Sequence, residues 1–461
     1  MGGSGDWLRT LETWLEPFLA RLGHPARRRM CPLYVAGLIG PGERKSLQPI
    51  AARLSPAGYD QLHHFITVGP WDDGPLEAEL LAQADRLVGG PDAILVIDDT
   101  ALPKKGQLSV GVAPQYASAL GKNANCQTLV SLTLAQGEVP VPIALRLFLP
   151  ETWTNNPERM RRAGVPEACQ AERSKPEIAL AELKRALEAG VRFRAVVADA
   201  GYGISAAFRR ALSALGLLWA VGIPRIQKVY PVDVQLVPAP PTRGRPRKTL
   251  IPDMEAVAAE KMVAARPWRW LTWRQGTKGP LRAQFAALRV RVADGPEVRL
   301  QGRTGQHLPG AEVWLVGERR ASGEQKYYLS NLPPDTTLKQ LASTIKARWV
   351  CEQAHQQLKE ELGLDHFEGR SWRGLHRHAL MSLIAFCFLQ HQRLAAVRRG
   401  KKAQGTPAAP EPSGHPTGAS RSPGPNRAPT MSLLPSPLQP AAAEQSTKVV
   451  LARVWSELSL S

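Results

Sequence analysis

The stretch AILVIDDT at residues 93–100 decides the fold, and AVVADAGYG at residues 195–203 repeats its form. In each stretch, a short apolar run rich in Val or Ile predicts a buried strand. The first run ends on Asp98 and Asp99, and the second ends on Asp199. Because ligands of open α/β sheets usually bind at the carboxyl ends of strands, the two runs predict acids gathered at one sheet edge.

The segments around these strands predict an α/β fold. Further strand-like runs occupy residues 109–112, 126–135 and 141–149, and a helix is predicted to begin at Ser174 and to stop at Gly190. Three strands, a helix and a fourth strand are the opening order of a ribonuclease H-like sheet, although other α/β folds begin in the same way.

The second half of the chain predicts an interruption of this sheet and a return to it. Pro, Arg and Trp clusters alternate with short strand-like runs over residues 224–310, which indicates an inserted β-rich module. Residues 312–320 and 326–332 then look like a hairpin. Thr337 and Gln340 have capping-box spacing and predict the start of a long helix that also carries Glu352.

We therefore expect a ribonuclease H-like mixed sheet flanked by helices, with a helical N-terminal module and an inserted β-rich domain. The expected parts are a helical DNA-binding module, two core segments separated by the insertion, and a mostly disordered Pro/Ala/Ser-rich tail. Their boundaries are 1–90 for the N-terminal module, 91–223 and 311–397 for the core, 224–310 for the insertion and 398–461 for the tail.

The composition favours a polyanionic partner. Lys and Arg number 59 against 40 Asp and Glu, for a formal net charge of +19. Nucleic acid is the leading candidate, while a merely Arg-rich host composition remains the alternative. The five cysteines form no close pair, which fits a reducing cytoplasm. The longest strongly apolar stretch, Ala379 to Leu389, is shorter than the roughly 20 residues that span a bilayer, so we expect a soluble protein without a membrane partner.

A third acid has basic neighbours at helical spacing. Arg348, Glu352, His355 and Lys359 are offset by four, three and four residues, so we expect them on one helix face. Hard divalent cations prefer oxygen ligands, and three convergent acids suit two Mg²⁺ ions, with Mn²⁺ as the alternative. Taken singly, each acid is more commonly a strand-end turn or a solvated salt-bridge partner. The conjunction of all three favours the metal site.

These residues resemble the DDE transposases of bacterial insertion sequences, especially insertion-sequence families four and seven-hundred-one. The resemblance covers most of residues 94–203 and 348–389. It is carried by VIDDTALPKKGQLSVGVAPQYASALGKNANCQTLVSL, LFLPETWTNNPERMRRAGVPE, SKPEIALAELKRALEAGV with VVADAGYG, and RWVCEQAHQQLKEELGLDHFEGRSWRGLHRHALMSLIAFCFL.

The resemblance implies a catalytic, metal-binding triad of Asp99, Asp199 and Glu352, with Asp98 as the alternative first ligand. It also implies that Arg348 and Lys359 contact DNA phosphates. Ile345 stands where the family has a Tyr, which removes an auxiliary DNA contact but no metal ligand.

The implied activity is metal-dependent cleavage at transposon ends and strand transfer into target DNA, with a hairpin intermediate left open. The implied partner is double-stranded DNA, bound by a homodimer in the bacterial cytoplasm, associated with the nucleoid. Two rivals remain: a catalytically silent transposase-derived DNA-binding protein, and a ribonuclease H-like nuclease without strand transfer.

Other basic and aromatic residues allow two interpretations each. Arg243 and Arg245, in RGRPRK, suit either a narrow minor groove or phosphate contacts. Lys104 and Lys105 could bind phosphate or face water. For the tryptophans at 268, 270 and 273 we expect packing for most, with stacking on a flipped base as the alternative.

Overall fold

The computed structural model describes residues 4–54, 58–117, 120–238, 250–276, 279–298 and 306–404. Five strands form the centre of its large sheet in the order β4–β3–β1–β5–β6. The pairs β1–β3 and β3–β4 are antiparallel, whereas β1–β5 and β5–β6 are parallel. This is the predicted ribonuclease H-like arrangement. The bounds are β1 (Ile94–Pro103), β2 (Ala113–Ala117), β3 (Lys122–Gln136), β4 (Val139–Phe148), β5 (Ala195–Ala198) and β6 (Leu218–Ile223).

Both faces of the central strands are covered, which explains their nearly continuous apolar runs. Ile94 and Val96 face Cys351 of helix α13 (Trp349–Glu360) on one side of the sheet. Leu95 and Ile97 belong to the main core on the other side. Because side chains alternate along a strand, this pattern sends Asp98 and Asp99 to opposite faces.

The β-rich insertion extends the central sheet. Strand β13 pairs with β14, and β14 pairs with β6, so the predicted hairpin of residues 312–320 and 326–332 is confirmed. β13 crosses position 310 without a break. The elements are β7 (Lys228–Tyr230), β8 (Leu236–Pro238), β9 (Leu250–Pro252), β10 (Val257–Ala258), α11 (Ala259–Ala264), β11 (Arg269–Gly276), β12 (Gly279–Val298), β13 (Gln306–Arg319) and β14 (Gln325–Ser330).

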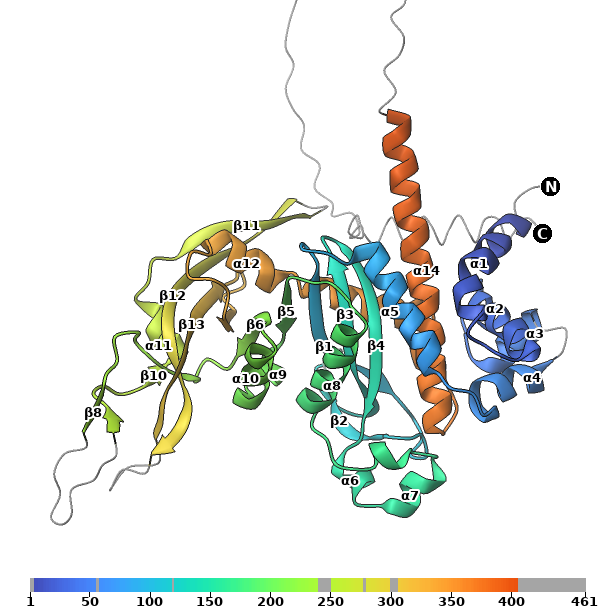
Figure 1. Ribbon diagram of the computed structural model, residues 1–461, viewed down its shortest axis with the longest axis horizontal. Coiled ribbons are helices and arrows are strands. Elements are labelled where there is room, and N and C mark those ends of the chain that lie inside the picture. Colours follow the sequence, from blue (N-terminus) through green and yellow to red (C-terminus); the bar gives the residue numbers. More distant parts are fainter. Residues whose placement is uncertain are drawn as a thin grey trace, which may run out of the picture.

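Helices cover the other end of the molecule (Figure 1), where α1 to α5 gather around the long helix α14. Their bounds are α1 (Ser4–Leu19), α2 (Pro25–Ile39), α3 (Leu47–Leu54), α4 (Tyr59–His63), the π-helix His64–Val68, α5 (Gly74–Val88) and α14 (Trp372–Gln404). By length and composition alone, α14 could cross a membrane, but most of its apolar part is buried against the rest of the protein, as in a core helix.

The remaining helices connect strands of the sheet, except α12, which lies between β14 and α13. The predicted helix start at Ser174 and the predicted capping box at Thr337 are confirmed, and both α8 and α12 begin with a capping box. The bounds are α6 (Glu151–Thr154), α7 (Pro157–Arg162), α8 (Lys175–Glu188), α9 (Ala200–Gly203), α10 (Ala206–Ala214) and α12 (Leu338–Lys346), with short 3₁₀ turns at Glu167–Cys169 and Leu364–His366.

Three local predictions were wrong. Residues 109–112 form a turn rather than a strand, because Gly111 adopts a φ of +72°. The helix that begins after Thr337 ends at Lys346, so Glu352 lies on the separate helix α13. Helix α14 continues through Arg398 to Gln404, past the predicted start of the tail. The rest of that predicted tail, residues 405–461, lies outside the described residues.

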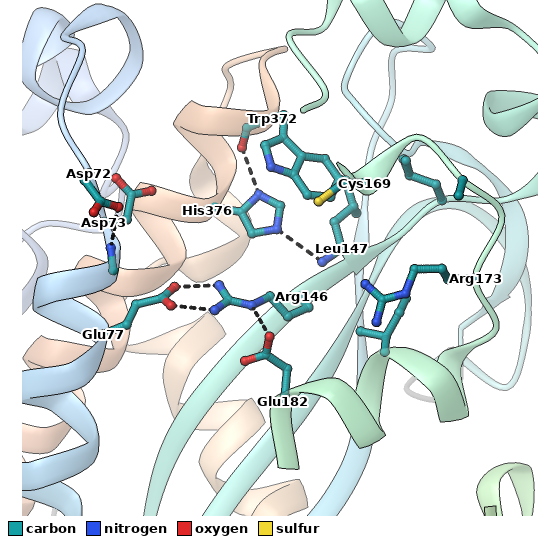
Figure 2. A pocket seen from close by; sticks show the side chains of 14 residues that line it. Asp72, Asp73, Glu77, Arg146, Leu147, Cys169, Arg173, Glu182, Trp372 and His376 are labelled. Carbon is teal, nitrogen blue, oxygen red and sulfur yellow. Dashed lines mark hydrogen bonds and ion pairs between the residues drawn. The ribbon is translucent and has the colours of Figure 1, made fainter. Parts of the chain in front are cut away.

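An ion cluster joins the N-terminal helices to the sheet (Figure 2). Arg146 of β4 donates to both Glu77 oxygens, each at 2.6 Å, and to Glu182 of α8 at 2.8 Å. The side chains of Arg146, Glu77 and Glu182 are only 22%, 15% and 12% exposed. A bidentate ion pair with so little solvent exposure is costly to break, because water cannot hydrate the charged groups that are left unpaired.

Replacing Arg146 by Met should lower the free energy of unfolding by about 3 kcal/mol, because the largely buried Glu77 loses its bidentate partner and shares only Arg185 with Glu182. Denaturant unfolding measures this. Arg162→Met is the matched control, since the Arg162–Glu158 pair is 80% and 72% exposed and should contribute little. Equal effects of the two substitutions would contradict a structural role for the cluster.

Two buried histidines of α14 should make the protein acid-sensitive. Burial lowers the pKa of both His376 and His378 to about 4. Unfolded histidine titrates near pH 6.5, so the unfolded state binds more protons below that pH and stability falls as the pH drops from about 6.5 to 4. Each histidine contributes a slope of up to about 1.4 kcal/mol per pH unit.

Denaturant unfolding at several pH values tests this expectation. Nε2 of the neutral His378 ring donates to the carbonyl oxygen of Gly363 at 3.0 Å, so its Nδ1 accepts from the Tyr34 hydroxyl at 2.8 Å. His378→Gln should retain polar partners there while flattening the slope between pH 6.5 and 4. His64→Gln, at an exposed histidine, should leave the slope unchanged. A wild-type stability that is constant over this range would refute the assignment.

Candidate active site

Asp98 and Asp199 lie side by side at the carboxyl edge of β5. The parallel register pairs Ile97 of β1 with Ala198 of β5, so the residues that follow them, Asp98 and Asp199, are neighbours. Burial raises the pKa of Asp98 to about 7, despite the opposing charge of Arg348, and the Asp199 charge adds to the rise. Burial likewise raises the pKa of Asp199. These two acids therefore sit where a further positive charge would be stabilising.

Asp199 is also held by the backbone that follows it. Its Oδ1 accepts from the N–H of Gly201 at 2.9 Å and from that of Tyr202 at 3.4 Å, which caps helix α9. Gly203 packs so closely against β6 that an added Cβ would lie 1.9 Å from the carbonyl oxygen of Gly222. The Gly-Tyr-Gly turn thus fixes the carboxylate against the sheet.

Arg348 bridges the first acid to the third. Its guanidinium donates to Asp98 Oδ2 and to Glu352 Oε1. The Glu352 side chain is 58% exposed, whereas that of Asp98 is 11% exposed, so the pair spans from the interior to the surface. Although burial opposes it, the nearby carboxylates raise the pKa of Arg348. Asp98 and Glu352 therefore share one cation.

Asp99 faces the other side of the sheet. The Tyr202 hydroxyl donates to its Oδ1, and the Lys175 ammonium binds its Oδ2. These contacts tie β1 to the turn after Asp199 and to the start of α8. The structure thus brings Asp98, rather than Asp99, to the face that carries Glu352. The prediction that Asp99 is the first metal ligand did not consider which face of the sheet each side chain takes.

His355 does not share the Glu352 face, contrary to expectation. It is buried, and its Nε2 lies 2.7 Å from the hydroxyl of Ser131 on β3. Ser131 in turn donates to the carbonyl oxygen of Asp98 at 3.2 Å. Burial lowers the pKa of His355 to about 3, so it is neutral at physiological pH. Sequence inspection missed this connection, for which the one signal was a serine inside the apolar run of β3.

The basic residues predicted to contact DNA lie in different environments. Lys359 is half-buried on α13, and Lys105 is exposed. Lys104 is already engaged, because its ammonium donates to the carbonyl oxygens of Asp365 at 3.0 Å and Phe367 at 2.8 Å. The predicted contacts Arg243 and Arg245 lie outside the described residues.

A pocket of about 420 Å³ opens beside Glu352, between α13 and the insertion. Three aromatic side chains line it together with several basic ones, and these are Trp273, Tyr328, Trp349, Arg282, Arg320, Lys326 and Lys346. Trp273 packs under the Lys346 ammonium at 4.7 Å, and Trp268 under the Arg319 guanidinium at 3.9 Å. Trp270 differs, since it is 51% exposed.

The donor set suits a hard cation. Among the described residues no three His, Cys, Asp or Glu side chains are close enough together to hold a metal ion as they lie. The Arg348 guanidinium occupies the space between Asp98 and Glu352, and the pKa of Asp98 and that of Asp199 are both raised. Anionic oxygens that repel one another and already hold a cation fit a divalent ion that replaces it.

Comparisons with known proteins show the family of this chain. The family described as DDE superfamily endonuclease matches residues 17–280, more than half of the chain. The probable transposase for insertion sequence element IS701 of Microchaete diplosiphon is 32% identical over 188 residues, which are 41% of this chain and 46% of that relative. The match therefore spans just under half of the relative's length.

A solved structure is also similar over much of the chain. The cryo-EM structure of the piggyBac transposase synaptic complex with hairpin DNA aligns at a TM-score of 0.41 and 10% identity, covering 86% of this chain and 74% of that one. The family match covers β1 to β6, with Asp98, Asp99 and Asp199. The chain belongs to the DDE endonuclease superfamily, whose chemistry depends on divalent metal.

Proposed function

We propose that the protein is a DNA transposase that cleaves DNA at transposon ends and transfers the freed strand into target DNA. The observation that carries the proposal is the register of β1 and β5, which sets Asp98 beside Asp199 while Arg348 links Asp98 to Glu352. A member of a metal-dependent endonuclease superfamily with three such acids is suited to phosphodiester chemistry.

Asp98, Asp199 and Glu352 are the metal ligands in this proposal, in place of the triad with Asp99. Two facts support the exchange. Asp98 shares the Arg348 guanidinium with Glu352, and Asp99 is already satisfied by Tyr202 and Lys175 on the opposite face. Two Mg²⁺ ions, or Mn²⁺, would activate the attacking hydroxyl and stabilise the leaving oxygen at the phosphate.

The chain's own residues would hold the DNA around this centre. Arg348 becomes available for a phosphate once its carboxylates bind cations, and Lys359 follows it along the same helix. The aromatic and basic pocket beside Glu352 is large enough for a nucleotide next to the cut. The partner is double-stranded DNA, bound in the cytoplasm by a homodimer.

Replacing Asp98 by Asn should lower the rate of Mg²⁺-dependent cleavage of end-bearing DNA by about 1,000-fold, because several kcal/mol of metal-mediated stabilisation are lost. Asp99→Asn is the matched control at the adjacent position. It should cost about tenfold or less, because it loosens only the tie to Tyr202 and Lys175. Single-turnover cleavage, with DNA binding measured alongside, separates the two effects.

The reverse ranking of these variants would assign the ligand to Asp99, and full activity of both would refute the site. The rival functions give different products in the same assay. A silent DNA-binding descendant retards DNA but never nicks it. A nuclease without strand transfer leaves cut ends that never join a supercoiled target.

A further inference from the structure

A positively charged hollow of about 330 Å³ lies away from the acids, between helix α7 and residues 370–371. Arg159 and Arg162 line it from α7, and Arg370 lines it from the segment that leads into α14. The buried Trp153 lines it as well. Two segments about 200 residues apart in the sequence thus converge on one basic concavity.

No carboxylate of the described residues lines this hollow. Arg370 is exposed, and within the described chain its guanidinium has no ion pair or hydrogen bond. Arg162 pairs only with Glu158 at the surface, where such a pair is weak. The positive charge of the hollow is therefore largely uncompensated by the protein.

The hollow is a rigid feature. Trp153 is 1% exposed, and its indole N–H donates to the carbonyl oxygen of Val112 at 2.9 Å. A backbone hydrogen bond from Trp372 N to Ala163 O, at 2.8 Å, joins the two segments to each other, and one from Val110 N to Arg370 O, at 3.2 Å, joins the second segment to the turn after β1. The arginines are thus held near one another before any ligand arrives.

The chemistry favours a phosphate over a base. The Arg159 guanidinium lies 3.8 Å from the centroid of the Trp153 ring and donates to the carbonyl oxygen of Gln107 at 2.7 Å. The ring is therefore already covered and offers no face for stacking. Guanidinium groups with free N–H donors bind phosphate oxygens well.

The hollow lies on a continuation of the strand that carries the first acid. The part of β1 from Asp98 to its end at Pro103 is about 17 Å long at 3.3 Å per residue. The following loop passes the exposed Lys105 and reaches the hollow at Leu108. We therefore estimate a separation on the order of 20 Å between Asp98 and the hollow, which corresponds to about six base pairs of duplex DNA.

We propose that this hollow binds a phosphodiester of duplex DNA several base pairs from the cut. The inference rests on the proposed function, because it assumes that DNA is cut at the acids. The contact is made to the backbone alone, so it orients the duplex and adds affinity for any sequence.

The test compares Arg159→Ala, Arg370→Ala and the matched control Arg161→Ala in the full chain. Arg161 is an exposed arginine of the same helix that does not line the hollow. DNA binding is measured in EDTA at several salt concentrations, with end-bearing and unrelated duplexes. Each hollow variant should weaken both duplexes several-fold and reduce the slope of log K against log salt by about 0.9, while the control changes neither.

Arg370→Lys should restore most of the salt dependence of DNA binding. This variant distinguishes the loss of a positive charge from a loss of folding. An unchanged slope for both hollow variants overturns the inference, as does a loss confined to one DNA sequence. Binding of inorganic phosphate at the hollow, with DNA binding unaffected by the variants, would assign it to a free anion and also overturn it. Because EDTA prevents cleavage, these results hold or fail separately from the catalytic proposal.

Discussion

The parallel pairing of β1 with β5 is the constraint on which the candidate site depends. It aligns Ile97 with Ala198 and so sets two buried aspartates beside one another at the point where the apolar runs end. Such a pair is electrostatically unfavourable by itself, and burial raises the pKa of both acids. The strain is relieved by a cation, which is the Arg348 guanidinium in this structure and a divalent ion in the proposed active state.

Because side chains alternate along β1, the neighbouring acids Asp98 and Asp99 face opposite sides of the sheet and contact different residues. Asp98 faces α13, where Arg348 and Glu352 lie, while Asp99 faces Tyr202 and Lys175. The contacts of Asp99 with Tyr202 and Lys175 connect three elements that carry or border the site, namely β1, the turn after Asp199 and the start of α8. His355 and Ser131 make a similar connection on the first face, from α13 to the backbone of Asp98. The carboxylates are thus supported from both sides of the sheet.

Much of this fold could be predicted from local patterns. The apolar runs that end on Asp98 and Asp199 marked two central strands, and the cap signals at Ser174 and Thr337 marked two helix starts, because such signals act within a few residues. The break between α12 and α13 lacked a local signal, since neither Gly nor Pro occurs there. The turn at Gly111 was hidden by a short apolar run that also suits a strand.

The choice between Asp98 and Asp99 could not be made locally, because both follow the same apolar run. The face that each side chain takes depends on which neighbours the strand acquires, and a shift of one residue exchanges them. The Ser131–His355 contact is similarly non-local, since it joins positions 224 residues apart. Family resemblance supplied the type of site, whereas the proposal of Asp98 as its first member rests on the tertiary register.

Anomalous scattering from crystals of the protein bound to Mn²⁺ and a cleaved transposon end tests this account most directly. The account predicts manganese peaks among the carboxylates of Asp98, Asp199 and Glu352, with Arg348 displaced from between them. A peak bound by Asp99 on the Tyr202 and Lys175 face, with Asp98 still paired to Arg348, would contradict it.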